Sequence, residues 1–162
     1  VIVNGNIVLG KGSIIKSGTY IEGNVWIGEN CVIGPNAYLR KGTVLCGTNK
    51  IGAFSEIKNS IFLEGAKAPH HNYVGDSIIG QNSNLGSGTK IANLRFDKKT
   101  IELKHKGKKI DSGRRKLGAI IGSNVNTGIN ASINAGTILG NYTKIGPNAL
   151  VSGTYESKST IA

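Results

Sequence analysis

Aliphatic side chains recur at every sixth position along most of the chain. The first series is uninterrupted and comprises Val3, Leu9, Ile15, Ile21, Ile27, Ile33, Leu39, Leu45, Ile51, Ile57 and Leu63. The register shifts between residues 63 and 79, and the period returns as Ile79, Leu85 and Ile91 and again as Ile121, Thr127, Ile133, Leu139, Ile145 and Val151. A period of six matches neither an amphipathic α-helix nor an alternating strand, so it predicts a repeat architecture.

Glycine or asparagine stands three residues after most of these aliphatic positions, for example at Gly12, Asn30 and Gly42. Both residue types tolerate a left-handed backbone, so the pattern predicts a corner in every repeat. The next side chain is small or medium, as at Cys31, which suits a second inward position. Short strands separated by corners form a parallel β-helix, in which each coil packs only on its neighbours. Three hexapeptide repeats to a triangular coil predict about seven coils.

Two segments depart from the repeat. The first spans about residues 64–78 and contains the run Lys67-Ala68-Pro69-His70-His71-Asn72-Tyr73-Val74-Gly75-Asp76. The second spans about residues 94–117. Because insertions into solenoid folds commonly carry function, we predict that both excursions leave the coil and that they are candidate functional segments.

Composition narrows the class of protein. The 162 residues include 24 Gly and no Met, which disfavours a helical bundle, and the two Cys cannot form a disulfide framework. No long apolar run or signal peptide is present, so we expect a cytoplasmic protein with no membrane partner. Because the chain starts at Val1 and lacks an initiator Met, we interpret residues 1–162 as one domain from a longer polypeptide.

The net charge of +11 is concentrated in the second excursion. Residues 95–116 contain ten Lys or Arg and three acidic residues, a balance of +7. Such a loop could bind nucleic acid, an acidic membrane or a phosphate-rich cofactor, or it could simply cover the coil or contact another subunit. Its only aromatic residue is Phe96, so the stacking platform of a single-strand nucleic-acid binder is missing. We therefore favour the phosphate-rich cofactor and expect no nucleic acid partner.

The outward positions of the repeats predict two surfaces. Arg40 and Lys58 are 18 residues apart, so they should stack about 4.8 Å from each other. Like charges so close repel, and we expect a phosphate over them. The sixth position of each repeat, counted from the aliphatic residue, also points outward. In the first half of the chain it is apolar, at Ile14, Tyr20, Trp26, Val32, Tyr38, Val44 and Phe62. Such a face is typical of contact with another subunit or with a domain outside this sequence.

His70 is the leading candidate for chemistry, because an imidazole accepts a proton near neutral pH and can act as general base toward an amine or hydroxyl. Neither Cys31 nor Cys46 has a neighbouring base, and no Gly-x-Ser-x-Gly motif occurs, so direct transfer is favoured over a covalent intermediate. A γ-type carbonic anhydrase needs three His on one zinc, which adjacent His70 and His71 with distant His105 do not suit. We expect no metal site.

The hexapeptide frame, the run at residues 67–76 and the segment Ile79-Gly80-Gln81-Asn82-Ser83-Asn84-Leu85-Gly86-Ser87-Gly88-Thr89 with Ala92-Asn93 resemble a known family. It comprises the C-terminal domains of bifunctional sugar-1-phosphate nucleotidylyltransferase/acetyltransferases. The resemblance implies an all-β, left-handed parallel β-helix that acetylates the 2-amine of glucosamine-1-phosphate with acetyl-CoA, for UDP-N-acetylglucosamine synthesis. It also implies a homotrimer with active sites between subunits, and a nucleotidyltransferase domain outside this chain.

Carried over residue by residue, the resemblance implies that His70 is the general base and that Asn93 aligns the amine and the acetyl group. The implied contacts to the sugar phosphate are made by Arg40, Lys58, Tyr73 and Asn84. The implied contacts to acetyl-CoA are made by Ser87 and Asn93, and Lys99 in the basic loop is a further candidate. No metal is implied for acetyl transfer.

The chain departs from the bacterial form of this family after Asn93. There the sequence reads Leu94-Arg95-Phe96-Asp97 and continues into the basic loop, a form that looks archaeal. The acceptor therefore includes galactosamine-1-phosphate as a second possibility. Two alternatives stay open: another hexapeptide-repeat sugar acyltransferase, and a non-catalytic β-helical assembly module.

Overall fold

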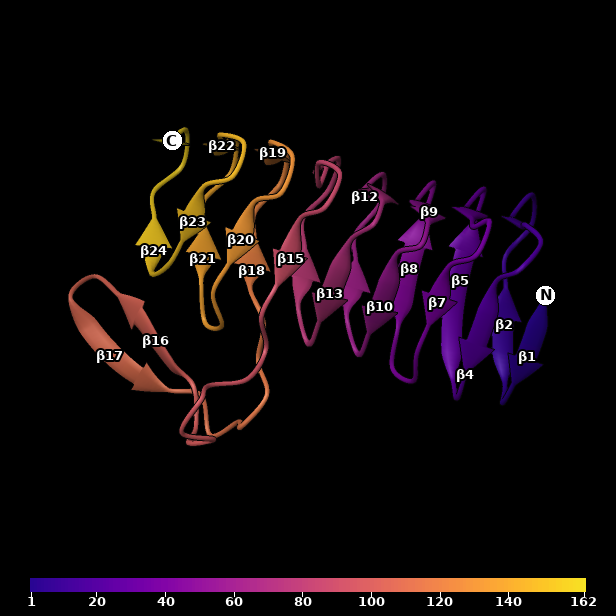
Figure 1. The fold of residues 1–162 in the computed structure, drawn as a ribbon, viewed down its shortest axis with the longest axis horizontal. Helices are drawn as coiled ribbons and strands as arrows, with labels where there is room; N and C mark the ends of the chain where they lie inside the picture. Colours follow the sequence, from indigo (N-terminus) through magenta and orange to yellow (C-terminus); the bar gives the residue numbers. More distant parts are fainter.

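The structure is a computed structural model that describes all of residues 1–162. It shows a parallel β-helix. Three sheets run along the long axis of the molecule, and the N- and C-termini lie at opposite ends (Figure 1). No helix is present, and so none is long and apolar enough to cross a membrane. The all-β β-helix predicted from the period of six is confirmed.

Sheets A and B each take one short strand from every coil. Sheet A contains β1 (Ile2–Asn4), β4 (Tyr20–Glu22), β7 (Tyr38–Leu39), β10 (Glu56–Lys58), β13 (Tyr73–Gly75), β15 (Lys90–Ile91), β20 (Ser132–Ile133) and β23 (Leu150–Val151). Sheet B contains β2 (Ile7–Leu9), β5 (Val25–Glu29), β8 (Val44–Gly47), β11 (Ile61–Phe62), β14 (Ile78–Ile79), β18 (Ile120–Ile121), β21 (Ile138–Leu139) and β24 (Thr154–Tyr155). Sheets A and B each contain eight strands, so the chain forms eight coils, one more than the predicted number of about seven.

Sheet C forms the third side in two parts. The first part contains β3 (Ile14–Ile15), β6 (Val32–Ile33), β9 (Lys50–Ala53) and β12 (Lys67–His70), and the second contains β19 (Asn126–Thr127), β22 (Lys144–Ile145) and β25 (Thr160–Ile161). Single bridges from Asn84 to Lys67 and to Asn126 connect the two parts. We call the corner between sheets A and B the A–B corner, and that between sheets C and A the C–A corner.

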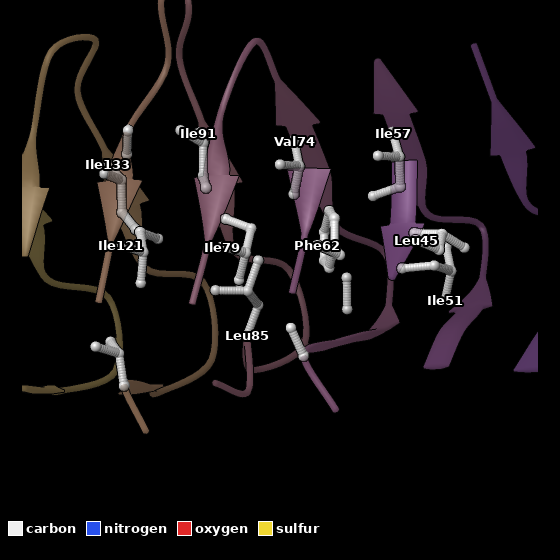
Figure 2. Close-up of a cluster of buried hydrophobic side chains, with 14 of the residues drawn as sticks. Leu45, Ile51, Ile57, Phe62, Val74, Ile79, Leu85, Ile91, Ile121 and Ile133 are labelled. Atoms are coloured by element: carbon white, nitrogen blue, oxygen red, sulfur yellow. The ribbon is translucent and has the colours of Figure 1, made fainter. Parts of the chain in front are cut away.

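The recurring aliphatic residues fill the interior. Figure 2 shows side chains from successive coils pointing into the space between the sheets, and those of Leu45, Ile51 and Ile57 are fully buried. Cys31 is also fully buried, as predicted. Each such aliphatic side chain stabilises the fold by about 1.5–3 kcal/mol relative to an exposed one. The core is a column along the axis, so each coil is stabilised by its neighbours.

The first predicted excursion is wrong, because residues 64–78 stay in the coil. Strand β12 pairs in parallel with β9, and β13 pairs with β10. The register between these coils is 17 residues in place of 18, as Glu56 opposite Tyr73 shows. One residue is missing from the A–B corner after Ile57, so Phe62 is fully buried and Leu63 is not. The prediction that Phe62 points outward is therefore also wrong.

The second excursion is confirmed. Residues 94–117 leave the coil at the A–B corner and form an antiparallel hairpin of β16 (Glu102–His105) and β17 (Lys108–Asp111). The hairpin projects beside the last coils (Figure 1). Ile101 at its base is 1% exposed, and Thr154 in β24 donates a hydrogen bond to Lys104 O. The loop is therefore anchored on the coils at its base and through β16, whereas β17 is exposed.

The apolar outward residues named from the sequence do not form one face, because Ile14 and Val32 lie on sheet C and Tyr20 and Tyr38 on sheet A, so that prediction is wrong. A continuous apolar row is found instead on sheet B. In register along that sheet lie Val8, Trp26, Val44, Ile61, Ile78, Ile120 and Ile138, which we call the sheet-B stripe. Trp26 is 53% exposed and Ile78 is 41% exposed. The sequence placed this surface in the first half of the chain, but the stripe continues through the second half, because the basic loop returns the chain to the same register.

Candidate active site

A buried carboxylate at the A–B corner joins three of the candidate residues. Asp76 accepts hydrogen bonds from Lys58 Nζ at 2.9 Å and from Asn93 Nδ2 at 2.5 Å. Asn93 Nδ2 also lies 3.3 Å from the hydroxyl oxygen of Tyr73. Asn59 Nδ2 donates to the other carboxylate oxygen at 2.7 Å. We call these five residues the Asp76 cluster. Lys58, Tyr73 and Asn93 are therefore brought together.

The shortened corners create this arrangement. Asn59 and Asp76 have positive φ angles of 46° and 51°, a conformation that Asn and Asp adopt more readily than most residues. A side chain at Gly75 would place its Cβ 2.5 Å from Asn93 Nδ2 and 2.9 Å from the Tyr73 hydroxyl. Glycine at this position therefore lets the side chains from adjacent coils approach each other.

Asp76 is ionised within the cluster. Its side chain is 7% exposed, and this burial by itself raises the pKa of the carboxyl. Hydrogen bonds from Asn59, Lys58 and Asn93, with the positive charge of Lys58, outweigh burial and hold the pKa of Asp76 below its ordinary value. The carboxylate thus fixes the Lys58 ammonium and the Asn93 amide in one geometry.

Arg40 lies one coil before Lys58 at the same corner, with its backbone N–H donating to Ile57 O at 2.8 Å. Its guanidinium contacts Glu56 at 2.8 Å and Glu22 at 3.8 Å. The hydrogen bond to Glu56 raises the pKa of Arg40 above its ordinary value. Carboxylates of the chain therefore already relieve the repulsion between Arg40 and Lys58, so this repulsion by itself does not require a bound phosphate.

His70 lies at the C–A corner, at the end of β12. Asn72 holds the turn that follows: its side-chain oxygen accepts from the backbone N–H of His70 at 3.1 Å, and its amide donates to Gly86 O at 2.8 Å. Asn72 is 2% exposed, whereas the His70 side chain is exposed and bonded to no other residue. The adjacent His71 stacks on Phe54 with the ring centroids 5.3 Å apart. Of the two adjacent imidazoles, His70 is therefore the one that stacks on no other ring.

The other candidates lie apart from the Asp76 cluster. Gly88 N donates to His70 O at 3.0 Å, so neighbouring Ser87 lies one coil beyond His70 at the same corner. Asn84 is on sheet C, between Lys67 and Asn126. Lys99 is exposed in the inserted loop, and its backbone N–H donates to Asp97.

Within one chain, the candidate residues thus occupy two corners of the helix. Arg40, Lys58 and Asn93 lie at the A–B corner, whereas His70 and Ser87 lie at the C–A corner. Tyr73 belongs to sheet A between them. Sequence reasoning missed Asp76, although it lies about one coil length after both Lys58 and Asn59, a spacing that brings residues of a β-helix close together. No group of three His, Cys, Asp or Glu side chains converges to hold a metal ion.

The repeats and the fold define a hexapeptide-repeat protein. A family model described as bacterial transferase hexapeptide (six repeats) matches residues 24–59 and 118–153. The polysialic acid O-acetyltransferase OatWY has a similar solved structure, with a TM-score of 0.55 and 18% identity over 94% of this chain and 79% of that one. This likeness shows the fold, a left-handed parallel β-helix.

Two archaeal relatives define the family more closely. A bifunctional sugar-1-phosphate nucleotidylyltransferase/acetyltransferase of Sulfurisphaera tokodaii is 53% identical over 149 residues, which are 92% of this chain and 37% of the relative. The bifunctional protein GlmU of Methanococcus maripaludis strain C5 is 47% identical over 159 residues, which are 98% of this chain and 38% of the relative. Over nearly all of its length the chain is homologous to part of these bifunctional proteins, and it spans less than two fifths of their length.

Proposed function

We propose that this domain transfers the acetyl group of acetyl-CoA to the 2-amine of glucosamine-1-phosphate or galactosamine-1-phosphate. The observation that carries the proposal is the convergence of Lys58, Tyr73 and Asn93 on Asp76, since the family resemblance assigns all three to the substrates. The name of the Sulfurisphaera tokodaii relative, a sugar-1-phosphate nucleotidylyltransferase/acetyltransferase, supports sugar acetyl transfer. We further propose that the domain belongs to a longer chain with an N-terminal nucleotidyltransferase domain.

The reaction is a direct substitution at the thioester. The sugar amine attacks the acetyl carbonyl, a C–N bond forms and the C–S bond breaks. The imidazole of His70 takes the proton that the amine loses, and the sulfur leaves as the thiolate of CoA, which is then protonated. Asn93, held by Asp76 and Tyr73, orients the amine and the acetyl group. Lys58 and Arg40 bind the sugar phosphate by charge-assisted hydrogen bonds.

The two-corner arrangement favours a homotrimer, because the C–A corner of one subunit can complete the A–B corner of the next. The sheet-B stripe adds an apolar surface suited to subunit contact. We expect light scattering to give three times the chain mass of 17.0 kDa, and Trp26→Lys in the stripe to shift the protein toward monomer. A monodisperse wild-type monomer would contradict this proposal.

Arg40→Ala is expected to raise the KM for the sugar phosphate by about tenfold, because one charge-assisted hydrogen bond to the phosphate is lost. The kcat should change little, since Arg40 is not placed near the reacting amine. Lys11→Ala, an exposed cation in the first coil, serves as the control and should leave both constants unchanged. Initial rates over a series of sugar-phosphate concentrations measure the effect, and an unchanged KM for Arg40→Ala would exclude its role in binding.

Two other functions are distinguishable by experiment. Another hexapeptide-repeat sugar acyltransferase would acetylate a sugar hydroxyl or a nucleotide sugar in place of an amino-sugar phosphate. A non-catalytic assembly module would form oligomers and release no thiol from acetyl-CoA. A thiol-release assay with a panel of acceptors separates all three.

A further inference from the structure

We propose that the ring of Phe54 forms an aromatic wall beside His70, and that the apolar CH face of the acceptor sugar stacks on this wall. Phe54 then belongs to the substrate-binding residues, although nothing in the sequence pattern singled it out. The identity of the sugar rests on the proposed acetyl transfer, whereas the contact itself is measurable by binding alone.

The backbone of Phe54 is unusual for an aromatic residue. In every coil after the first, the residue two positions before the strand of sheet A has a positive φ angle. Five of these seven residues are glycine or asparagine, namely Gly18, Asn36, Gly88, Asn130 and Asn148. The other two are Phe54 and His71, with φ angles of 55° and 52°. A bulky side chain strains this conformation, and such strain gathers at active sites and ligand-binding positions.

Phe54 lies next to His70 at the C–A corner. In the parallel pairing of β9 with β12, Ala53 is opposite His70, so Phe54 directly follows a residue that is one strand spacing, about 4.8 Å, from His70. The ring of His71 packs on Phe54 at a centroid distance of 5.3 Å and an interplanar angle of 25°. Phe54 is nevertheless 60% exposed. An apolar ring therefore faces solvent within reach of any molecule that His70 contacts.

Hydrogen bonds to both neighbouring coils fix the corner that carries this ring. The backbone N–H of Phe54 donates to Asn36 O at 3.2 Å. The next residue, Ser55, is 1% exposed; its hydroxyl donates to Ala68 O at 3.1 Å and accepts from the backbone N–H of Asn72 at 3.2 Å. Because Asn72 also holds the turn after His70, the aromatic wall and the imidazole are carried by one connected framework.

The level of Phe54 along the axis favours the acceptor over the donor. Phe54 is on the same coil as Lys58, which is proposed to bind the sugar phosphate, and β10 joins the two. Ser87, the implied contact to acetyl-CoA, lies on the opposite side of His70, one coil further on. In a trimer of subunits that lie side by side, these levels match between subunits. An aromatic ring suits a hexose, because the CH groups on one face of the sugar form an apolar surface.

The first test measures binding without catalysis. The whole chain is titrated calorimetrically with glucosamine-1-phosphate or galactosamine-1-phosphate, whichever binds the wild type more tightly. Phe54→Asn should weaken the affinity by about threefold to tenfold, because the stacking contact is lost. Asn suits the positive φ angle, so the Tm should stay unchanged or rise. Phe54→Tyr keeps the ring and should restore most of the affinity. An unchanged affinity in Phe54→Asn, an equal loss in Phe54→Tyr, or no binding to the wild type would overturn the wall.

Tyr142 supplies the matched control. It is 55% exposed and has a positive φ angle of 62°, but it lies between β21 and β22, at the corner between sheets B and C. Tyr142→Asn therefore removes an exposed aromatic ring from the same strained conformation, away from His70. Its affinity for the sugar phosphate should equal that of the wild type. An equal loss in Tyr142→Asn and Phe54→Asn would show that the effect is not local to His70 and would overturn the proposal.

The second test separates acceptor, donor and subunit contacts. In the thiol-release assay, Phe54→Asn should raise the KM for the amino-sugar phosphate and leave the KM for acetyl-CoA unchanged. A raised KM for acetyl-CoA alone would overturn the assignment to the acceptor. Dissociation of Phe54→Asn into smaller oligomers in light scattering would place the ring between subunits and would overturn the wall as well. If the wild type transfers no acetyl group, the proposed function fails, and the calorimetric titration still decides whether Phe54 contacts the sugar.

Discussion

Replacement of His70 by Ala is expected to lower the kcat for acetyl transfer by about 100-fold or more, the usual contribution of a general base. The fold should be unaffected, because the side chain is exposed and the turn depends on Asn72. Initial rates of thiol release give the effect on activity, and thermal unfolding gives the effect on stability.

His71 supplies the control for this variant. It has a positive φ angle of 52°, which Asn tolerates, so His71→Asn should keep both the fold and the activity. Full activity in His70→Ala would remove His70 from the mechanism. An equal loss in both variants would indicate that the shape of the turn, rather than the His70 imidazole, is required.

Asp76→Asn is the second variant with a large expected effect. It keeps a residue suited to the positive φ angle but removes the charge that pairs with Lys58, whose side chain is 19% exposed. Breaking a buried ion pair lowers the free energy of unfolding by about 3–5 kcal/mol. Because Lys58 is partly exposed, we expect Asp76→Asn to lower it by about 3 kcal/mol or less. We also expect kcat/KM for the acceptor to fall about tenfold or more, because Lys58 and Asn93 lose their common partner.

The pH dependence of stability distinguishes the contribution of the Asp76 charge from that of the shape of its side chain. Because the folded-state pKa of Asp76 lies below its ordinary value of 3.8, its ionisation stabilises the fold fully above that value. The contribution is lost as pH falls through the lower folded-state pKa. The difference in Tm between wild type and Asp76→Asn should therefore be constant near neutral pH and shrink below about pH 4.

Glu64→Gln is the control for Asp76→Asn, since Glu64 is an exposed acid that forms no ion pair. It should unfold like the wild type at every pH. A stability difference for Asp76→Asn that persists unchanged to pH 2 would show that the carboxylate charge is not what stabilises the cluster.

The period of six determined the architecture, because each aliphatic position is inward whatever the details of the corners. It could not reveal where a corner loses one residue, since Phe62 and Leu63 are both apolar and either could face inward. The structure distinguishes them through the 17-residue register of β10 and β13. Because the sequence does not reveal this change of register, it predicts that residues 64–78 leave the coil. In the structure the segment continues the coil.

The sequence predicted only part of the Asp76 cluster, since Asp76 and Asn59 were not among the candidate residues, and it did not predict the electrostatics. Lys58, Tyr73 and Asn93 follow from the family resemblance, and the structure brings them together. The spacing of 18 residues places Lys58 next to Arg40 on one side. The same spacing places Glu22 next to Arg40 on the other side, and this acid partly neutralises the guanidinium. Pairwise spacing identifies neighbours in a β-helix, whereas charge balance depends on the whole column of residues at a corner.

The measurement that tests the central claim most directly is thiol release from acetyl-CoA by the wild-type chain. We expect release with glucosamine-1-phosphate or galactosamine-1-phosphate, together with an N-acetylated product in mass spectrometry. N-acetylglucosamine-1-phosphate, whose amine is blocked, should give no release, and glucosamine without the phosphate should react poorly. Absence of release with both amino-sugar phosphates in a folded, oligomeric preparation would contradict the proposed function.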